Sequence, residues 1–215
     1  MIIDVEARSA PTALDQLRPT APVAQRMIDA TIAVIDAGGE VAVRVQDIVA
    51  TVGVQIPVLY RHFGNRDGLV QAAQIERLVR DLDQELTQLG AAFDGASTAT
   101  EFRALFDELL ERVTAPDRAA MRSKRVNILG SAYGRPRLTA AVAAMQVSGV
   151  ERIVQLFERP QREGWIRADL DLAAFAAWFA GQALGRILID LGDTNVDGDA
   201  WNALSAQAVR FVLFG

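Results

Sequence analysis

Residues 43–69, VRVQDIVATVGVQIPVLYRHFGNRDGL, constrain the fold most, because they are patterned as two short helices joined by a glycine turn. Ile48, Val49 and Val52 give the first helix an apolar face. Gly53 then permits the sharp turn that ends this helix, since glycine adopts left-handed backbone angles without steric cost. The segment therefore predicts a helix-turn-helix unit.

The second helix of this unit can begin directly after the turn. Pro57 falls in its first turn, where the missing N–H costs nothing. Leu59 and Phe63 are four residues apart, so both face inward. The outer face is left to Ile56, Val58, Tyr60, Arg61 and His62, which are free to contact a ligand.

This pattern resembles the DNA-reading helix-turn-helix of the TetR family, roughly GVS..TLY.HF..K..L, through Gly53, Leu59, Tyr60, His62 and Phe63. The resemblance implies that the second helix lies in the major groove of a double-stranded DNA operator. It also implies that Tyr60, Arg61 and His62 bind phosphate oxygens. The DNA-binding residues expected in this way are Arg44, Gln46, Ile56, Pro57, Val58, Tyr60, Arg61, His62 and Arg66.

The segment departs from the family pattern at both helix starts. Val45 stands where the family has a capping Thr or Ser, and Gln55 replaces the Ser cap of the second helix. Each such loss weakens a cap by about 1 kcal/mol. Ile56 and Val58 also make the tip of the second helix apolar, which predicts DNA reading through thymine methyl groups and DNA shape.

The charge of the segment 22–70 does not by itself favour DNA, because four arginines oppose five acidic residues and give −1. The whole chain carries −5, whereas phosphate neutralisation supplies most nonspecific affinity for DNA. We therefore expect the basic groups to gather on one face. A helical small-molecule carrier or sensor that has lost sequence-specific DNA binding remains the alternative.

Composition bounds the other function classes. The chain has 215 residues, 51% of them hydrophobic, no cysteine and one histidine. Disulfides, thiol chemistry and cysteine-based zinc sites are excluded, and no catalytic or metal-binding constellation is present. We expect no enzyme activity, cofactor or metal. No run approaches the about 18 apolar residues of a membrane span, and the start lacks a secretory leader, so a cytoplasmic protein without membrane contact is expected.

Helical periodicity continues through the chain, so the predicted fold is all-α. We expect a flexible N-terminal arm over 1–21, a three-helix helix-turn-helix DNA-binding domain over 22–68, and a helical ligand-binding and dimerisation domain over 69–215. The expected helices span 23–37, 69–89, 98–114, 116–132, 137–163, 172–191 and 200–213, besides the two of the helix-turn-helix.

The helix expected over 172–191 is apolar around most of its circumference, with a narrow polar stripe of Gln182, Arg186 and Asp190. Such a helix needs covering on two sides, by its own domain and most simply by a second subunit. The expected homodimer interface comprises Ala177, Gly181, Gly185, Leu188, Leu204, Ala208 and Phe211. A buried central helix in a monomer is the alternative.

A small molecule bound in the C-terminal domain would release the DNA, and repression is the majority expectation for the family. The candidate effector-binding residues are Phe102, Phe106, Arg125, Tyr133, Gln146, Phe157, Trp165 and Phe179, although residues of these types more often belong to the core. The run Arg122, Lys124, Arg125 is expected to be a solvated helix face.

Overall fold

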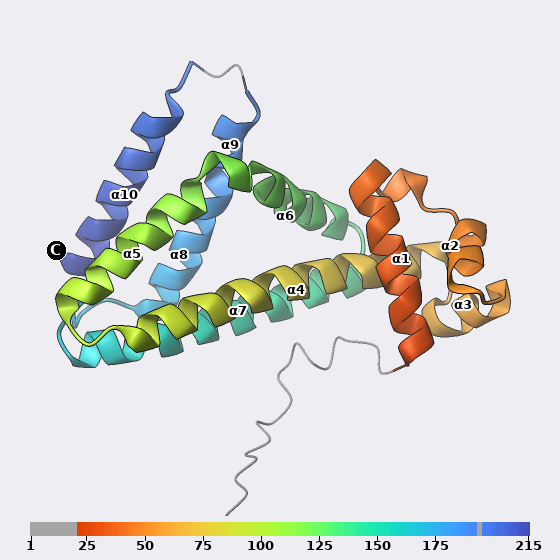
Figure 1. Ribbon diagram of the computed structural model, residues 1–215, viewed down its shortest axis with the longest axis horizontal. Coiled ribbons are helices and arrows are strands. Elements are labelled where there is room, and N and C mark those ends of the chain that lie inside the picture. Colours follow the sequence, from red (N-terminus) through yellow and green to blue (C-terminus); the bar gives the residue numbers. More distant parts are fainter. Residues whose placement is uncertain (1–20, 193–194) are drawn as a thin grey trace, which may run out of the picture.

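The computed structural model describes residues 21–192 and 195–215, and every regular element within these ranges is helical. The predicted all-α fold is confirmed. The arm predicted over 1–21 lies outside the described residues, except for Ala21. Figure 1 shows a small helical head at one end of two long helices and a larger helical body at the other.

The head comprises α1 (Pro22–Gly38), the 3-10 turn η2 (Glu40–Ala42), α2 (Val45–Val52) and α3 (Ile56–Phe63). Its apolar faces meet in one core, in which Met27, Ile48 and Leu59 are fully buried together with Leu69 of the next helix. The predicted inward position of Leu59 is confirmed, while Phe63 is half-buried against the same core.

Helix α4 (Arg66–Gly95) connects head and body. The Asn65 side chain caps it by accepting a hydrogen bond of 2.7 Å from the Gly68 N–H. Its first turns complete the head core, and the rest runs beside α7 (Pro136–Arg162) along the length of the molecule (Figure 1). The boundary expected at 68/69 therefore falls inside a continuous helix, and α4 extends about two turns beyond its expected end.

The remaining helices form the body: α5 (Ala99–Thr114), the 3-10 turn η3 (Pro116–Arg118), α6 (Ala119–Ala132), α8 (Leu172–Gly185), α9 (Ile187–Asp190) and α10 (Gly198–Phe214). Aromatic side chains from α4, α5, α7 and α8 form its core, with Phe102 and Phe106 fully buried beside Phe157. Helix α8 is capped by Asp171, whose carboxylate accepts a hydrogen bond from the Ala174 N–H at 2.9 Å.

The helix expected over 172–191 is interrupted at Arg186, directly after the helix-weakening Gly185. The polar stripe predicted there is used inside the fold. Arg186 donates to Asp190 Oδ1 at 2.9 Å and to Asn202 Oδ1 of α10 at 3.0 Å, and is 6% exposed. By length and composition alone, Leu172–Asp190 is long and apolar enough to cross a membrane, with a mean hydropathy of 1.5. No uninterrupted apolar run of this length occurs in the sequence, because Gln182 and Arg186 divide the stretch.

Candidate nucleic-acid interface and effector cavity

The turn between α2 and α3 has the geometry expected of a helix-turn-helix. Gly53 adopts φ 74° in the left-handed region, and the Val54 N–H donates to Val49 O at 3.0 Å. Gln55 precedes α3 without a side-chain cap, as predicted. The weak start predicted for α2 is present one residue earlier than expected: its N-cap residue is Arg44, which makes no side-chain cap hydrogen bond, and Val45 is the buried first helical residue.

The outer face of α3 presents three polar side chains to solvent. Tyr60 is 47% exposed, and Arg61 and His62 are exposed beside it. Within 21–192 and 195–215, neither Arg61 nor His62 makes a hydrogen bond or an ion pair. Pro57 and, from α2, Gln46 are exposed as well. This face therefore offers donors and positive charge that the fold itself does not use.

Three predicted DNA-binding residues are engaged in the head instead. Ile56 and Val58 are half-buried and pack against the head core, so the tip of α3 is less apolar than predicted. Arg66 donates through Nε to Val43 O at 3.0 Å and through Nη2 to Glu40 O. Its guanidinium holds the η2 segment in place, which makes it a structural residue rather than a free cation.

Arg44 is intermediate between these two groups. Its side chain is exposed, yet Nη1 donates to Val41 O at 2.5 Å and to Val43 O at 3.2 Å. The remaining guanidinium nitrogens have no partner in the part of the chain that is described. Backbone carbonyls thus hold one end of the Arg44 guanidinium, and its other N–H groups can bind a phosphate.

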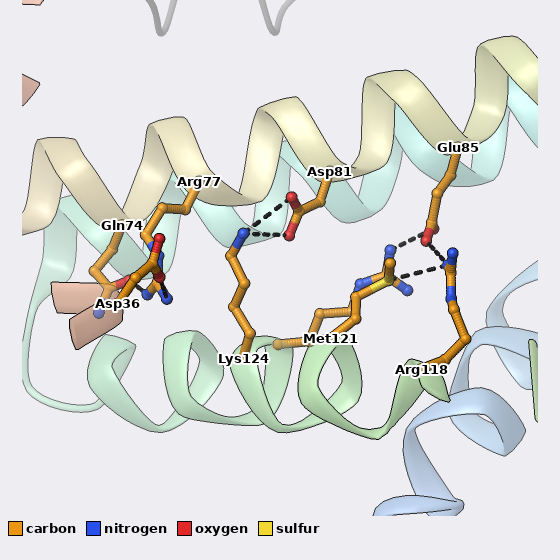
Figure 2. A network of polar contacts seen from close by, with 9 residues as sticks. Asp36, Gln74, Arg77, Asp81, Glu85, Arg118, Met121 and Lys124 are labelled. Atoms are coloured by element: carbon orange, nitrogen blue, oxygen red, sulfur yellow. Dashed lines mark hydrogen bonds and ion pairs between the residues drawn. The ribbon is translucent and has the colours of Figure 1, made fainter. Parts of the chain in front are cut away.

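Most acidic residues of the segment 22–70 are ion-paired with arginines that follow it in the chain. Arginines from outside 22–70 pair with four of the five: Arg80 with Asp29 at 2.6 Å, Arg77 with Asp36, and Arg135 with Glu40 at 2.9 Å and with Asp67 at 3.0 Å. Figure 2 shows the Asp36 contact together with Gln74. Burial alone would raise the pKa of Glu40, but hydrogen bonds from Arg135 and Gln74 outweigh it and lower that pKa. The net charge of the segment is thus misleading, because arginines from outside it neutralise four of its five acids; Asp47, exposed on α2, makes no ion pair among the described residues.

A cavity of about 280 Å³ lies in the body between α4, α5, α6, α7 and α8. Two of the predicted effector-binding residues, Arg125 and Phe179, line it. The others do not: Phe102, Phe106 and Phe157 are core residues, Trp165 packs against Phe102, Tyr133 is 94% exposed at the end of α6, and Gln146 is exposed on α7. The core aromatics are unavailable to the cavity because their rings pack on one another, whereas Tyr133 and Gln146 face solvent.

The cavity wall contains charged residues that were expected to face solvent or had no predicted role. Glu85 of α4 lies between Arg118 and Arg125, with Arg118 shown in Figure 2. Arg122 is 4% exposed and donates to Asp190 Oδ2 at 2.5 Å and to Val113 O at 2.8 Å. The prediction of a solvated face was therefore wrong for Arg122. One feature of the sequence could have indicated this wall: helical spacing places four residues on one face, namely Arg118, Met121, Arg122 and Arg125. No group of potential metal ligands occurs among the described residues.

The predicted dimer interface is a solvent-facing surface of α8, α9 and α10 in the single chain. Leu188 and Leu204 are each 66% exposed and Phe211 is 68% exposed. Ala177, Gly181 and Ala208 are also exposed, and Gly185 is partly so. Large apolar side chains exposed to this extent on neighbouring helices are typical of a protein-protein contact surface.

Comparisons with known proteins agree with this geometry. Residues 27–73 match the profile of bacterial regulatory proteins of the tetR family. No curated protein gives a match. A structure from Mesorhizobium loti, described as a TetR-family transcriptional regulator, has a TM-score of 0.66 at 14% identity and covers 90% of this chain and 97% of its own.

Two other similar structures contain small molecules. A transcriptional regulator structure from Saccharomonospora viridis in complex with choline gives a TM-score of 0.61 at 16% identity, over 89% of this chain and 97% of that one. FadR from Bacillus subtilis in complex with stearoyl-CoA gives 0.54 at 17% identity, over 88% and 97%. Residues 27–73 thus match the tetR-family DNA-binding domain, and the chain as a whole has the fold of solved TetR-family regulators.

Proposed function

We propose that this chain is a dimeric, ligand-responsive transcriptional repressor that binds a palindromic DNA operator and is released by a small molecule. The observation that carries the proposal is the asymmetry of the head. The exposed face of α3 presents Tyr60, Arg61 and His62, while four acidic residues are ion-paired elsewhere. An anionic duplex would meet this face without facing those carboxylates.

The DNA contacts follow from the placement of each side chain. Tyr60, Arg61 and His62 would donate to phosphates and fix the register of α3 on the duplex. Gln46 and Pro57, both exposed, lie where base edges or flanking phosphates would be met. Because Ile56 and Val58 are half-buried, thymine methyl contacts would make a smaller contribution than the sequence predicts.

Dimerisation would cover the apolar surface of α8, α9 and α10. Two helices from each subunit would form a four-helix bundle, an arrangement that buries the apolar faces of both subunits around a two-fold axis. Two α3 helices would then be presented about 34 Å apart, the spacing of successive major grooves on one side of a duplex.

Ligand response would depend on α4, since this helix lines the cavity and also completes the head core. An effector that binds one arrangement of the body more tightly would shift the population toward it and change the separation of the two heads. The choline and stearoyl-CoA complexes of the two similar proteins support a small-molecule role for the body.

Selection of binding sites from a random duplex library tests the proposal, with the wild type, Tyr60→Ala and Tyr133→Ala in parallel. Tyr133 is a matched control, because it is the other tyrosine of the chain and is 94% exposed outside the head. We expect the wild type and Tyr133→Ala to enrich one palindrome and Tyr60→Ala to lose it. Enrichment by none of the three would contradict operator binding and favour the carrier or sensor alternative.

A further inference from the structure

The polar part of the cavity wall is a cluster of two arginines and one glutamate. Glu85 Oε1 accepts from Arg118 Nη2, and Glu85 Oε2 accepts from Arg125 Nη2. Two guanidinium groups thus share a single carboxylate, which leaves one positive charge in excess. The arginine side chains are 21% and 25% exposed, so the cluster is accessible from the cavity but largely removed from bulk water.

Most N–H groups of these two arginines are unused. In the part of the chain that the structure describes, each guanidinium makes its polar contacts through Nη2 alone, with Arg118 also near Met121 Sδ at 3.0 Å. A guanidinium carries five N–H donors in a planar fork that matches a carboxylate or phosphate. The free edges of Arg118 and Arg125 can therefore bind a second anion beside Glu85.

The other arginines that line the cavity contribute differently. All three guanidinium nitrogens of Arg122 are bonded, to Asp190 and to two backbone carbonyls, so none of them is left to bind a ligand. Arg112 is exposed and donates to Gln88 at 3.1 Å, and the exposed Glu108 lies on the same helix. The opposite charges of Arg112 and Glu108 offset one another at the rim of the cavity. The excess positive charge remains at Arg118 and Arg125.

The rest of the wall is apolar. Leucines of α4 and α5 and aromatic or small residues of α8 face the same space: Leu82, Leu86, Leu105, Leu109, Phe179 and Ala183. A volume of about 280 Å³ lies near the lower end of small-molecule sites, which span roughly 300–1,000 Å³. The occupant must therefore be a small amphipathic molecule with an apolar body.

We propose that the effector is an amphipathic anion, whose carboxylate or phosphate group binds Arg118 and Arg125 beside Glu85 and whose apolar body lies against the leucines. Calling the ligand an effector rests on the proposed function, whereas the binding of an anion in the cavity does not. Because Glu85 repels the incoming anion while its own charge is satisfied by two arginines, its removal should tighten binding.

Isothermal titration calorimetry of the full chain at neutral pH tests the proposal with four probes of equal chain length: decanoate, decyl phosphate, decanol and decyltrimethylammonium. We expect an anionic probe to bind at least about tenfold more tightly than decanol, and the cation to bind more weakly than decanol. Preference for decanoate over decyl phosphate, or the reverse, identifies the head group. Equal binding of decanoate, decyl phosphate and decanol, tighter binding of the cation, or no binding at all would overturn the proposal.

Three variants locate the anion. Arg125→Gln should lose most of the anion preference and keep its affinity for decanol, which also shows that the cavity is intact. Glu85→Gln should bind the anion several-fold more tightly. Lys124→Gln is the control, since Lys124 is on the same helix but pairs with Asp81 at 2.9 Å and does not line the cavity. Unchanged anion preference in Arg125→Gln, or weaker anion binding in Glu85→Gln, would contradict the assignment.

The titration contains no DNA, so its outcome is independent of operator binding. A chain that selects a palindrome but binds no anion refutes this inference and leaves the proposed function standing. A chain that binds the anion but selects no palindrome refutes the proposed function and leaves this inference standing.

Discussion

Replacing Gly181 by alanine separates the stability of the single chain from the strength of the proposed dimer. In the described chain, a Cβ added at Gly181 meets nothing within 4 Å. Because Gly181 lies within α8, the substitution should stabilise each subunit by about 1 kcal/mol through helix propensity. This gain is the same in monomer and dimer and therefore cancels in the dimer dissociation constant.

The dimer adds a cost that the single chain does not have. If α8 packs closely against its symmetry mate along the small residues Ala177, Gly181 and Gly185, each new methyl group must be accommodated at about 1–3 kcal/mol. Two-fold symmetry places two methyl groups in the interface, so the expected cost is about 2–6 kcal/mol. At about 1.4 kcal/mol per tenfold change, the dimer should weaken by roughly 30-fold to 20,000-fold.

Sedimentation equilibrium over a range of concentrations measures this dissociation constant, and thermal unfolding measures the stability. Gly130→Ala is the matched control: Gly130 is an exposed glycine within α6 whose added Cβ also meets nothing within 4 Å. The control should gain stability and keep the wild-type dimer. A Gly181→Ala protein that dimerises as tightly as the wild type would refute the close approach of two α8 helices.

Three further substitutions test the ion pairs and the DNA-facing surface. Arg135→Gln should lower the free energy of unfolding by about 1–3 kcal/mol, because it leaves Glu40 without its charged partner. Since the pKa of Glu40 is lowered in the fold, this contribution is present above its ordinary pKa of 4.5 and disappears as the pH falls through the lowered value, so urea unfolding curves of the two proteins should converge in acid. Asp190→Asn should cost about 3–5 kcal/mol in the same assay, because it leaves two buried arginines unpaired, and a loss below 1 kcal/mol would contradict this. Arg61→Gln should leave thermal stability unchanged, weaken binding to all duplexes alike and reduce the salt dependence by about one phosphate contact per subunit, as measured by fluorescence anisotropy.

The helix-turn-helix was predictable from sequence because its signals are local. Gly53 fixes a turn, Pro57 fixes the start of a helix, and the apolar spacing fixes the inward face, so each element is specified within a few residues. The exposed triad of Tyr60, Arg61 and His62 follows from that same spacing.

The partners of charged residues were not predictable, because they come from distant parts of the chain. Arg66 could be read as a phosphate ligand until the fold placed it against the Val43 and Glu40 carbonyls. Arg122 belongs to a polar helix face by pattern, but its partner Asp190 is 68 positions away in the sequence. Pairings of this kind depend on tertiary packing, which periodicity does not encode.

The effector cavity was predicted by residue type and largely missed for the same reason. Aromatic residues are as suitable for a core as for a pocket, and Phe102, Phe106 and Phe157 fill the core by packing ring against ring. The cavity lies instead between α4, α5, α6, α7 and α8, and Glu85 with its two arginines forms the polar part of its wall.

The central claim is that two copies of the chain read the two halves of one DNA site through α3. The most direct test is fluorescence anisotropy at physiological salt with the selected duplex, with the same duplex carrying one scrambled half-site, and with Tyr60→Ala as a second protein. We predict two chains per duplex, at least about tenfold weaker binding when one half-site is scrambled, and loss of this preference in Tyr60→Ala. Equal binding to intact and scrambled sites by the wild type would contradict the claim.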